Sequence, residues 1–218
     1  FQEIGGHDPL YAPQSKEDSD IFNRFQLNGI KFVQTWGGCV YHMTCRGSRR
    51  NTVDKAKNIY EDSPEWLAQN QRSTKNFIRK WGHFVKHDIF MKPIIPPKYD
   101  IGFIVKNGSM QLLEALEPWC STVYINDANG NQYTQYVEKE QPNTTIDLSE
   151  KIKPYDNEKN NEILVTIEGN TFNQQDFGYI QQLSEILNNS GEIGSFELGN
   201  LHIDVIQINT YEKELIKL

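Results

Sequence analysis

The chain divides at a proline-rich stretch that reads Lys92-Pro93-Ile94-Ile95-Pro96-Pro97-Lys98. Proline fixes φ, lacks an amide donor and pushes the preceding residue toward extended backbone, so this stretch disfavours both helix and central strand. We therefore interpret residues 93–98 as a linker. It separates residues 1–92 from residues 99–218, and the pattern of apolar residues differs between the two parts.

The part before the linker contains two helix signals, each a serine cap followed by a glycine stop. The first predicts a helix from Ser15 to about residue 28, with Gly29 in the left-handed region. The second predicts a longer helix from Ser63 to about residue 81, ending at Gly82. Between them, residues 30–36 and 39–43 are expected to form strands.

The part after the linker is expected to be an α+β module in which one order of elements occurs twice. The predicted elements are a strand at 100–106, a helix at 109–117, a strand at 121–126 and an extended stretch at 133–138, then a strand at 162–168, a helix at 173–188 and a hairpin of 193–198 with 201–208. This order is βαββ twice, joined by a polar segment. No residue identity links the two copies, so the similarity is one of pattern only.

Composition excludes several classes of protein. The formal net charge of −7 argues against a general nucleic-acid binder, because neutralising phosphates requires a basic face. No apolar run approaches the roughly 20 residues that span a bilayer. The three cysteines, Cys39, Cys45 and Cys120, form no CxxC pair, which favours a reducing compartment. We therefore expect a soluble, cytoplasmic protein without structural zinc.

Four short motifs follow one another before residue 50. They read Gly5-Gly6-His7-Asp8, Lys16-Glu17-Asp18-Ser19-Asp20, Thr35-Trp36-Gly37-Gly38 and Val40-Tyr41-His42-Met43. Their order and spacing resemble the second half of the catalytic domain of family 2 glycosyltransferases, which have the GT-A fold. In that family a Gly-Gly-Phe-Asp-like turn precedes a Glu-Asp-x-Asp motif that opens a helix, and a strand then leads to a histidine. His7 departs from the aromatic residue usual in the turn.

The resemblance implies roles for three carboxylates. Asp18 would be the catalytic base that removes a proton from the attacking acceptor hydroxyl. Its position at the start of a helix favours the anion. Glu17 would position the acceptor, and Asp20 is a weaker candidate for substrate binding. The alternative is that all three merely complement the helix terminus, as acidic residues in first turns commonly do.

The resemblance also implies a divalent metal, with His42 as one ligand, although a lone histidine after a strand can equally be structural. Mn²⁺ suits mixed imidazole and carboxylate ligation better than Mg²⁺ does, and such a metal stabilises the leaving diphosphate. Arg46 and Arg49 could hold a donor pyrophosphate or an anionic acceptor bidentately, although a solvated basic loop explains them equally well. Trp36 could offer an aromatic face to a sugar ring, or could belong to the core.

Two hypotheses follow. In the first, residues 1–92 are the C-terminal part of a glycosyltransferase catalytic domain that uses a nucleotide-sugar donor and a glycan or other acceptor. The family's Asp-x-Asp metal motif lies in a preceding donor-binding half, so we expect the natural protein to extend upstream of Phe1 and this chain to be inactive alone. In the second, the module at 99–218 is a non-catalytic binding or assembly unit, with pairing into a homodimer through its strand edges.

Overall fold

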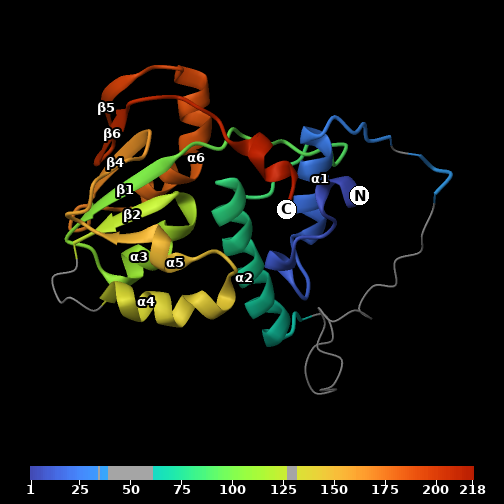
Figure 1. Cartoon of the computed structure of the whole chain (residues 1–218), viewed down its shortest axis with the longest axis horizontal. Helices are drawn as coiled ribbons and strands as arrows, with labels where there is room; N and C mark the ends of the chain where they lie inside the picture. Colours follow the sequence, from blue (N-terminus) through green and yellow to red (C-terminus); the bar gives the residue numbers. More distant parts are fainter. Residues whose placement is uncertain (34, 39–60, 127–131) are drawn as a thin grey trace.

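The computed structural model of the chain describes residues 1–33, 35–38, 61–126 and 132–218 (Figure 1). Over these residues the fold is mixed α/β, with one six-stranded sheet and six α-helices. The helices are α1 (Glu17–Leu27), α2 (Pro64–Trp81), α3 (Met110–Leu116), α4 (Gln132–Glu140), α5 (Leu148–Lys151) and α6 (Gln174–Ser190). The strands are β1 (Ile101–Lys106), β2 (Thr122–Ile125), β3 (Ile152–Pro154), β4 (Ile163–Glu168), β5 (Gly194–Leu198) and β6 (Leu201–Val205).

The sheet has the order β3-β2-β1-β4-β6-β5. Its first four strands in this order are parallel, whereas β6 runs antiparallel to both of its neighbours. The register places Phe103 beside Val123 and Val165, and Val165 beside Ile203. Paired residues point to the same face of a sheet, so these four buried side chains form one continuous apolar row.

The core lies between that face and the helices. Leu113 of α3 and Leu187 of α6 are fully buried and belong to the same apolar cluster as the row. On the opposite face of the sheet, Thr166 and His202 are only partly buried. Alternating buried and half-exposed residues along β4 and β6 are typical of a sheet with one face packed and the other solvated.

Helix α2 stands between the sheet and α1 (Figure 1). Its Phe77 and Trp81 pack with Leu10 and Tyr11 of the N-terminal segment, whereas Ile78 packs into the core of the sheet. The chain's last turn, Glu212–Ile216, lies beside α1. Both ends of the sequence therefore contribute to the half of the molecule that contains α1, and a domain boundary at residues 93–98 stays a prediction.

The second predicted helix is confirmed at both ends. The hydroxyl of Ser63 accepts a hydrogen bond of 3.2 Å from the Trp66 amide, and Pro64 occupies the first helical position. At the other end Gly82 has φ of 79°, the left-handed conformation in which glycine is least strained. The hairpin predicted about residues 199–200 is also confirmed, since β5 and β6 flank those two residues.

Other predictions were wrong. Residues 133–138 were expected to be extended but lie in α4, where Tyr133, Tyr136 and Val137 have helical spacing and face the core. The first half of the module therefore runs β-α-β-α rather than βαββ. The polar segment after it contains two elements that the sequence did not indicate, α5 and β3, both of which are very short.

The region around α1 also differs from the prediction. The helix begins at Glu17 rather than at a Ser15 cap, because Ser15 and Lys16 both have positive φ and the Ser15 hydroxyl donates to Asn70. Residues 30–33, 35 and 36 form no strand, and the strand expected at 39–43 lies outside the described residues. No helix in the described ranges has both the length and the apolar content needed to span a membrane.

Candidate active site at the start of α1

The first two motifs of the sequence are joined by one buried side chain, Arg24 of α1. Gly5 and Gly6 form a turn in which both have positive φ. The Arg24 guanidinium donates to the carbonyls of Ile4 at 2.7 Å and Gly6 at 2.5 Å, and its Nε donates to Asp20 Oδ2 at 2.8 Å. The glycine turn is therefore fixed against the first turn of the helix that carries the acidic motif.

Asp20 is the centre of this arrangement and is completely buried. In addition to the contact with Arg24, it accepts a hydrogen bond of 2.9 Å from the Trp81 indole and forms an ion pair of 2.7 Å with Lys80. Trp81 and Lys80 both lie at the end of α2. Lys80 also pairs with Asp8 at 2.8 Å. The structure thus places Asp20, the weaker candidate for substrate binding, inside the fold with both oxygens already engaged.

Asp18 and Glu17 lie differently. Asp18 is exposed, and no hydrogen bond or ion pair to its carboxylate is seen within the described part of the chain. It precedes Phe22 by four residues, so both side chains lie on one face of α1. Glu17 is partly buried, and its Oε2 is enclosed without a hydrogen-bond partner among the described residues. Both carboxylates predicted to act on an acceptor therefore have oxygens that the described fold does not engage.

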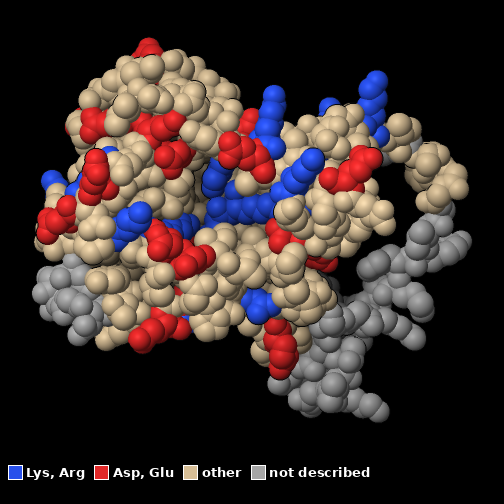
Figure 2. All heavy atoms as spheres, viewed as in Figure 1, with Lys and Arg blue, Asp and Glu red and all other residues tan. Residues whose placement is uncertain are grey.

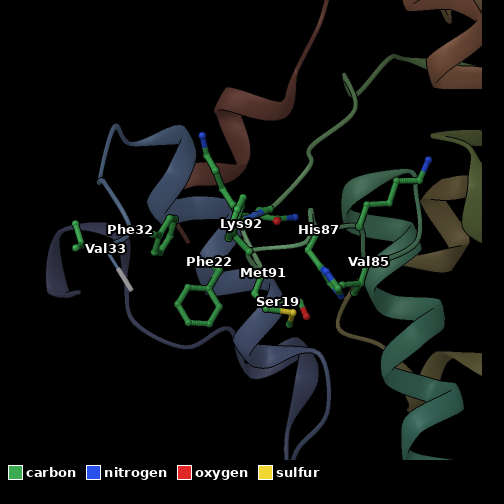
Figure 3. Close-up of a pocket in the computed structure, with 12 residues that line it drawn as sticks. Ser19, Phe22, Phe32, Val33, Val85, His87, Met91 and Lys92 are labelled. Atoms are coloured by element: carbon green, nitrogen blue, oxygen red, sulfur yellow. The ribbon is translucent and has the colours of Figure 1, made fainter. Parts of the chain in front are cut away.

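A pocket of about 290 Å³ lies beside α1, which contributes Ser19, Phe22 and Asn23 to its lining (Figure 3). Ser19 and Phe22 project toward it from α1, and His87 and Met91 reach it from the segment after α2. The rings of Phe22 and Phe32 meet edge to face with centroids 5.3 Å apart. The pocket therefore has aromatic and aliphatic walls, with a hydroxyl and an imidazole at its border.

Asn23 adds an amide to the lining of this pocket. The residue is 4% exposed, and its Nδ2 has no hydrogen-bond partner in the described ranges. A buried amide donor without a partner is costly, and most such groups in proteins are hydrogen-bonded. A polar ligand atom in the pocket would provide the missing acceptor.

A short turn forms the wall opposite α1. His87 pairs with Pro93 in an antiparallel bridge, and Asp88 Oδ1 accepts hydrogen bonds from the amides of Phe90 at 2.8 Å and Lys92 at 2.9 Å. The carboxylate of Asp88 thus holds the turn closed. The proline stretch that follows is in no helix or strand, and Pro93 is buried, with its carbonyl accepting a hydrogen bond from Gln26 of α1.

None of the predicted site residues in the described ranges is among those that line this pocket, since from α1 the lining comes from Ser19, Phe22 and Asn23. Trp36 is 98% exposed and is not among the residues that line it. His42, Arg46 and Arg49 fall outside the described residues. Across the ranges that the structure describes, no group of three or more His, Cys, Asp or Glu side chains could hold a metal. The Mn²⁺ or Mg²⁺ that the resemblance implies therefore stays a prediction carried by His42.

Sequence reasoning missed the residues that build the site. Arg24 stands four residues after Asp20, a spacing at which opposite charges meet on a helix, so this ion pair had a local signal. The pairing of Lys80 with Asp8 joins residues 72 positions apart and had no local signal.

Comparisons with protein-family models, with curated proteins and with solved structures find no match for this chain.

Proposed function

We propose that this chain forms the acceptor-side part of a glycosyltransferase, which moves a sugar from a nucleotide-sugar donor to an acceptor hydroxyl. One observation carries the proposal. The exposed carboxylate of Asp18 lies on the same face of α1 as Phe22, which lines an aromatic-walled pocket. A base beside a pocket of this kind is what activation of a sugar hydroxyl requires.

The walls of the pocket support a carbohydrate ligand. Sugars have apolar C–H faces that pack on aromatic rings, and Phe22 and Phe32 present such surfaces. Ser19 and the unpaired amide of Asn23 supply a hydroxyl and a donor for sugar oxygens. The volume of about 290 Å³ lies just below the range for small-molecule sites, roughly 300 to 1,000 Å³.

The acceptor oxygen forms a bond to the anomeric carbon of the donor, and the bond from that carbon to the nucleoside diphosphate breaks. The diphosphate leaves with the electron pair, while Asp18 takes the proton of the acceptor hydroxyl. Glu17, one residue earlier, would accept a hydrogen bond that orients the acceptor. Arg46 and Arg49 would bind the pyrophosphate of the donor. A metal held by His42 would stabilise the leaving diphosphate.

Saccharide binding by the chain itself tests the proposal. Saturation-transfer NMR with a panel of mono- and disaccharides should show contact of at least one sugar with aromatic protons. Phe22→Ala should abolish this signal, because it removes a wall of the pocket. Phe1→Ala removes a ring that is 58% exposed, against 45% for Phe22, and that does not line the pocket, so it should leave the signal intact. If no sugar in the panel binds, or if both variants behave alike, the proposal fails.

Transfer assays test the role of Asp18. We expect this chain to give no robust turnover with nucleotide sugars and Mn²⁺, because the resemblance places donor binding in another half of the domain. If turnover is found, the fragment hypothesis is wrong, and Asp18→Asn must then abolish transfer without weakening saccharide binding in the NMR assay. Full activity of Asp18→Asn would exclude it as the base.

A second candidate function, binding to another protein chain, is favoured by a separate observation. Ile89 is 90% exposed at the tip of the turn after α2, and Phe90 and Met91 beside it are also exposed. Clustered apolar side chains on a surface commonly mark interaction sites. Light scattering after size-exclusion chromatography should then detect a homodimer that Ile89→Glu dissociates. A monomer at all concentrations would exclude self-association through this turn.

A further inference from the structure

A second cavity, of about 400 Å³, lies where α2 ends and the first strands of the sheet begin. Its walls come from the end of α2, the residues just before β2, the segment between α4 and α5, and the C-terminal turn. Figure 2 shows Lys and Arg side chains gathered in a hollow at this place, between the sheet and α1. The volume is within the range of small-molecule sites.

The lining of this cavity is strongly basic although the chain carries a net charge of −7. Four cationic side chains line it, namely Arg79, Lys80, Lys98 and Lys151. Among the described residues of the lining, Asp8 is the one carboxylate. Cations gathered in a hollow with low-dielectric walls produce a focused positive potential, which attracts anions.

Two of the four cations are held in place by one buried carboxylate. Glu117 is completely buried and pairs with Arg79 at 2.7 Å and with Lys151 at 2.8 Å, so that one carboxylate serves two cations. Burial acts to raise the pKa of Glu117, but Lys151 and Arg79 outweigh it and lower this pKa to about 2. The ion pairs therefore persist at neutral pH and hold the two cations in fixed positions at the edge of the cavity.

Lys98 differs from the other three cations. No carboxylate lies within ion-pair distance of it in the described part of the chain; its Nζ donates at 3.0 Å to the carbonyl of Arg79, near the end of α2. Burial, together with repulsion from Lys151, lowers the pKa of Lys98 to about 8. An ammonium group has three N–H donors. Lys98 is thus still charged at neutral pH, with donor capacity and no anion beside it.

We propose that this cavity binds the phosphate group of a small phosphate ester. Lys98 would form the ion pair that it lacks, and the hydroxyls of Ser121 and Thr145 in the lining would donate further hydrogen bonds to the phosphate oxygens. Leu10, Ile146 and Leu215 also line the cavity and provide an apolar surface for the organic part. This site shares no lining residue with the pocket beside α1, and it does not depend on the glycosyltransferase proposal.

The test measures binding of inorganic phosphate and of pyrophosphate to the whole chain by calorimetry and by thermal shift, at constant ionic strength. The unaltered chain should bind at least one of them saturably at millimolar concentration. Lys98→Met should weaken binding about tenfold or more, the amount expected for loss of one charge-assisted hydrogen bond. Thr145→Asp places a carboxylate in the lining from an exposed position and should weaken binding at least as much.

Two matched variants control for net charge. Lys139→Met removes an exposed cation on α4, and Thr134→Asp adds a carboxylate to the same helix; neither residue lines the cavity. Both should bind within twofold of the unaltered chain. Thr145→Asp decides the question if Lys98→Met does not fold. The proposal is overturned if phosphate and pyrophosphate do not bind, if potassium chloride reproduces the thermal shift, or if binding survives Thr145→Asp unchanged.

Discussion

Replacing Asp20 by Asn should destabilise the fold, because Asp20 anchors the first turn of α1 to the end of α2. Asp20 is buried and accepts from Arg24 at 2.8 Å, Lys80 at 2.7 Å and Trp81 at 2.9 Å. The amide keeps the shape of the side chain but removes its charge, which leaves two cations without their shared anion. Removing one partner of a buried ion pair typically costs about 3 to 5 kcal/mol.

That cost is a large part of the total free energy of unfolding. Domains are stable by only about 5 to 15 kcal/mol, and for chains of this length each kcal/mol moves the melting temperature by about 2 to 4 °C. Asp20→Asn should therefore lower the Tm by about 10 °C, measured by circular dichroism. Part of the loss is offset because Arg24 keeps its bonds to Ile4 and Gly6, and Lys80 keeps Asp8.

Asp18→Asn is the matched control. It is the same chemical change two residues away, at an exposed carboxylate, and substitutions at such positions usually lie within about 0.5 kcal/mol. A double-mutant cycle between Asp20→Asn and Arg24→Met should give a coupling energy above about 1 kcal/mol. The reasoning is refuted if Asp20→Asn costs less than about 1 kcal/mol, or if it and Asp18→Asn destabilise the chain equally.

Two further predictions concern other parts of the fold. Burial lowers the pKa of His83 from 6.5 to about 4. Between pH 6.5 and 4 the imidazole is therefore protonated in the unfolded chain but not in the folded one. The free energy of unfolding should fall by about 3 kcal/mol as the pH drops through this range. Urea unfolding across this range should show a flatter dependence for His83→Gln, and parallel curves would contradict the assignment. Gly199 has φ of 63°, and an added Cβ would lie 2.5 Å from Asp176 Oδ1, so Gly199→Ala should cost about 1 to 3 kcal/mol in thermal unfolding. Gly178→Ala, with open space around a helical glycine, should instead raise stability by about 0.5 to 1 kcal/mol, and a gain at both positions would refute the steric argument.

Local signals in the sequence predicted the elements whose ends are set by neighbouring residues. Helix α2 has its cap, its proline and its glycine stop within the segment itself, so it could be predicted closely. The Gly199-Asn200 pair likewise marked the β5–β6 hairpin. Helix α4 was mistaken for an extended stretch because an apolar pattern of only a few residues fits more than one period, and packing against the core decides between them.

The candidate site was predictable only in part. The sequence indicated that Glu17, Asp18 and Asp20 share the first turn of a helix, which is correct. It could not say which of them faces solvent, because that depends on Arg24 and Lys80 converging on Asp20 from two helices. The aromatic wall was equally hidden. Phe22 is 45% exposed, because the buried face of α1 is occupied by Asp20, Ile21, Asn23 and Arg24.

The two proposed sites meet at one residue. Lys80 lines the basic cavity and also pairs with Asp20, which fixes the helix that carries Asp18. A bound phosphate that attracted Lys80 would weaken the ion pair between Lys80 and Asp20. Phosphate binding in the cavity would therefore loosen the first turn of α1. Lys98 and Thr145 line the cavity without contacting α1 in any described hydrogen bond or ion pair. Altering them therefore tests phosphate binding alone, whereas altering Lys80 would disturb both sites at once.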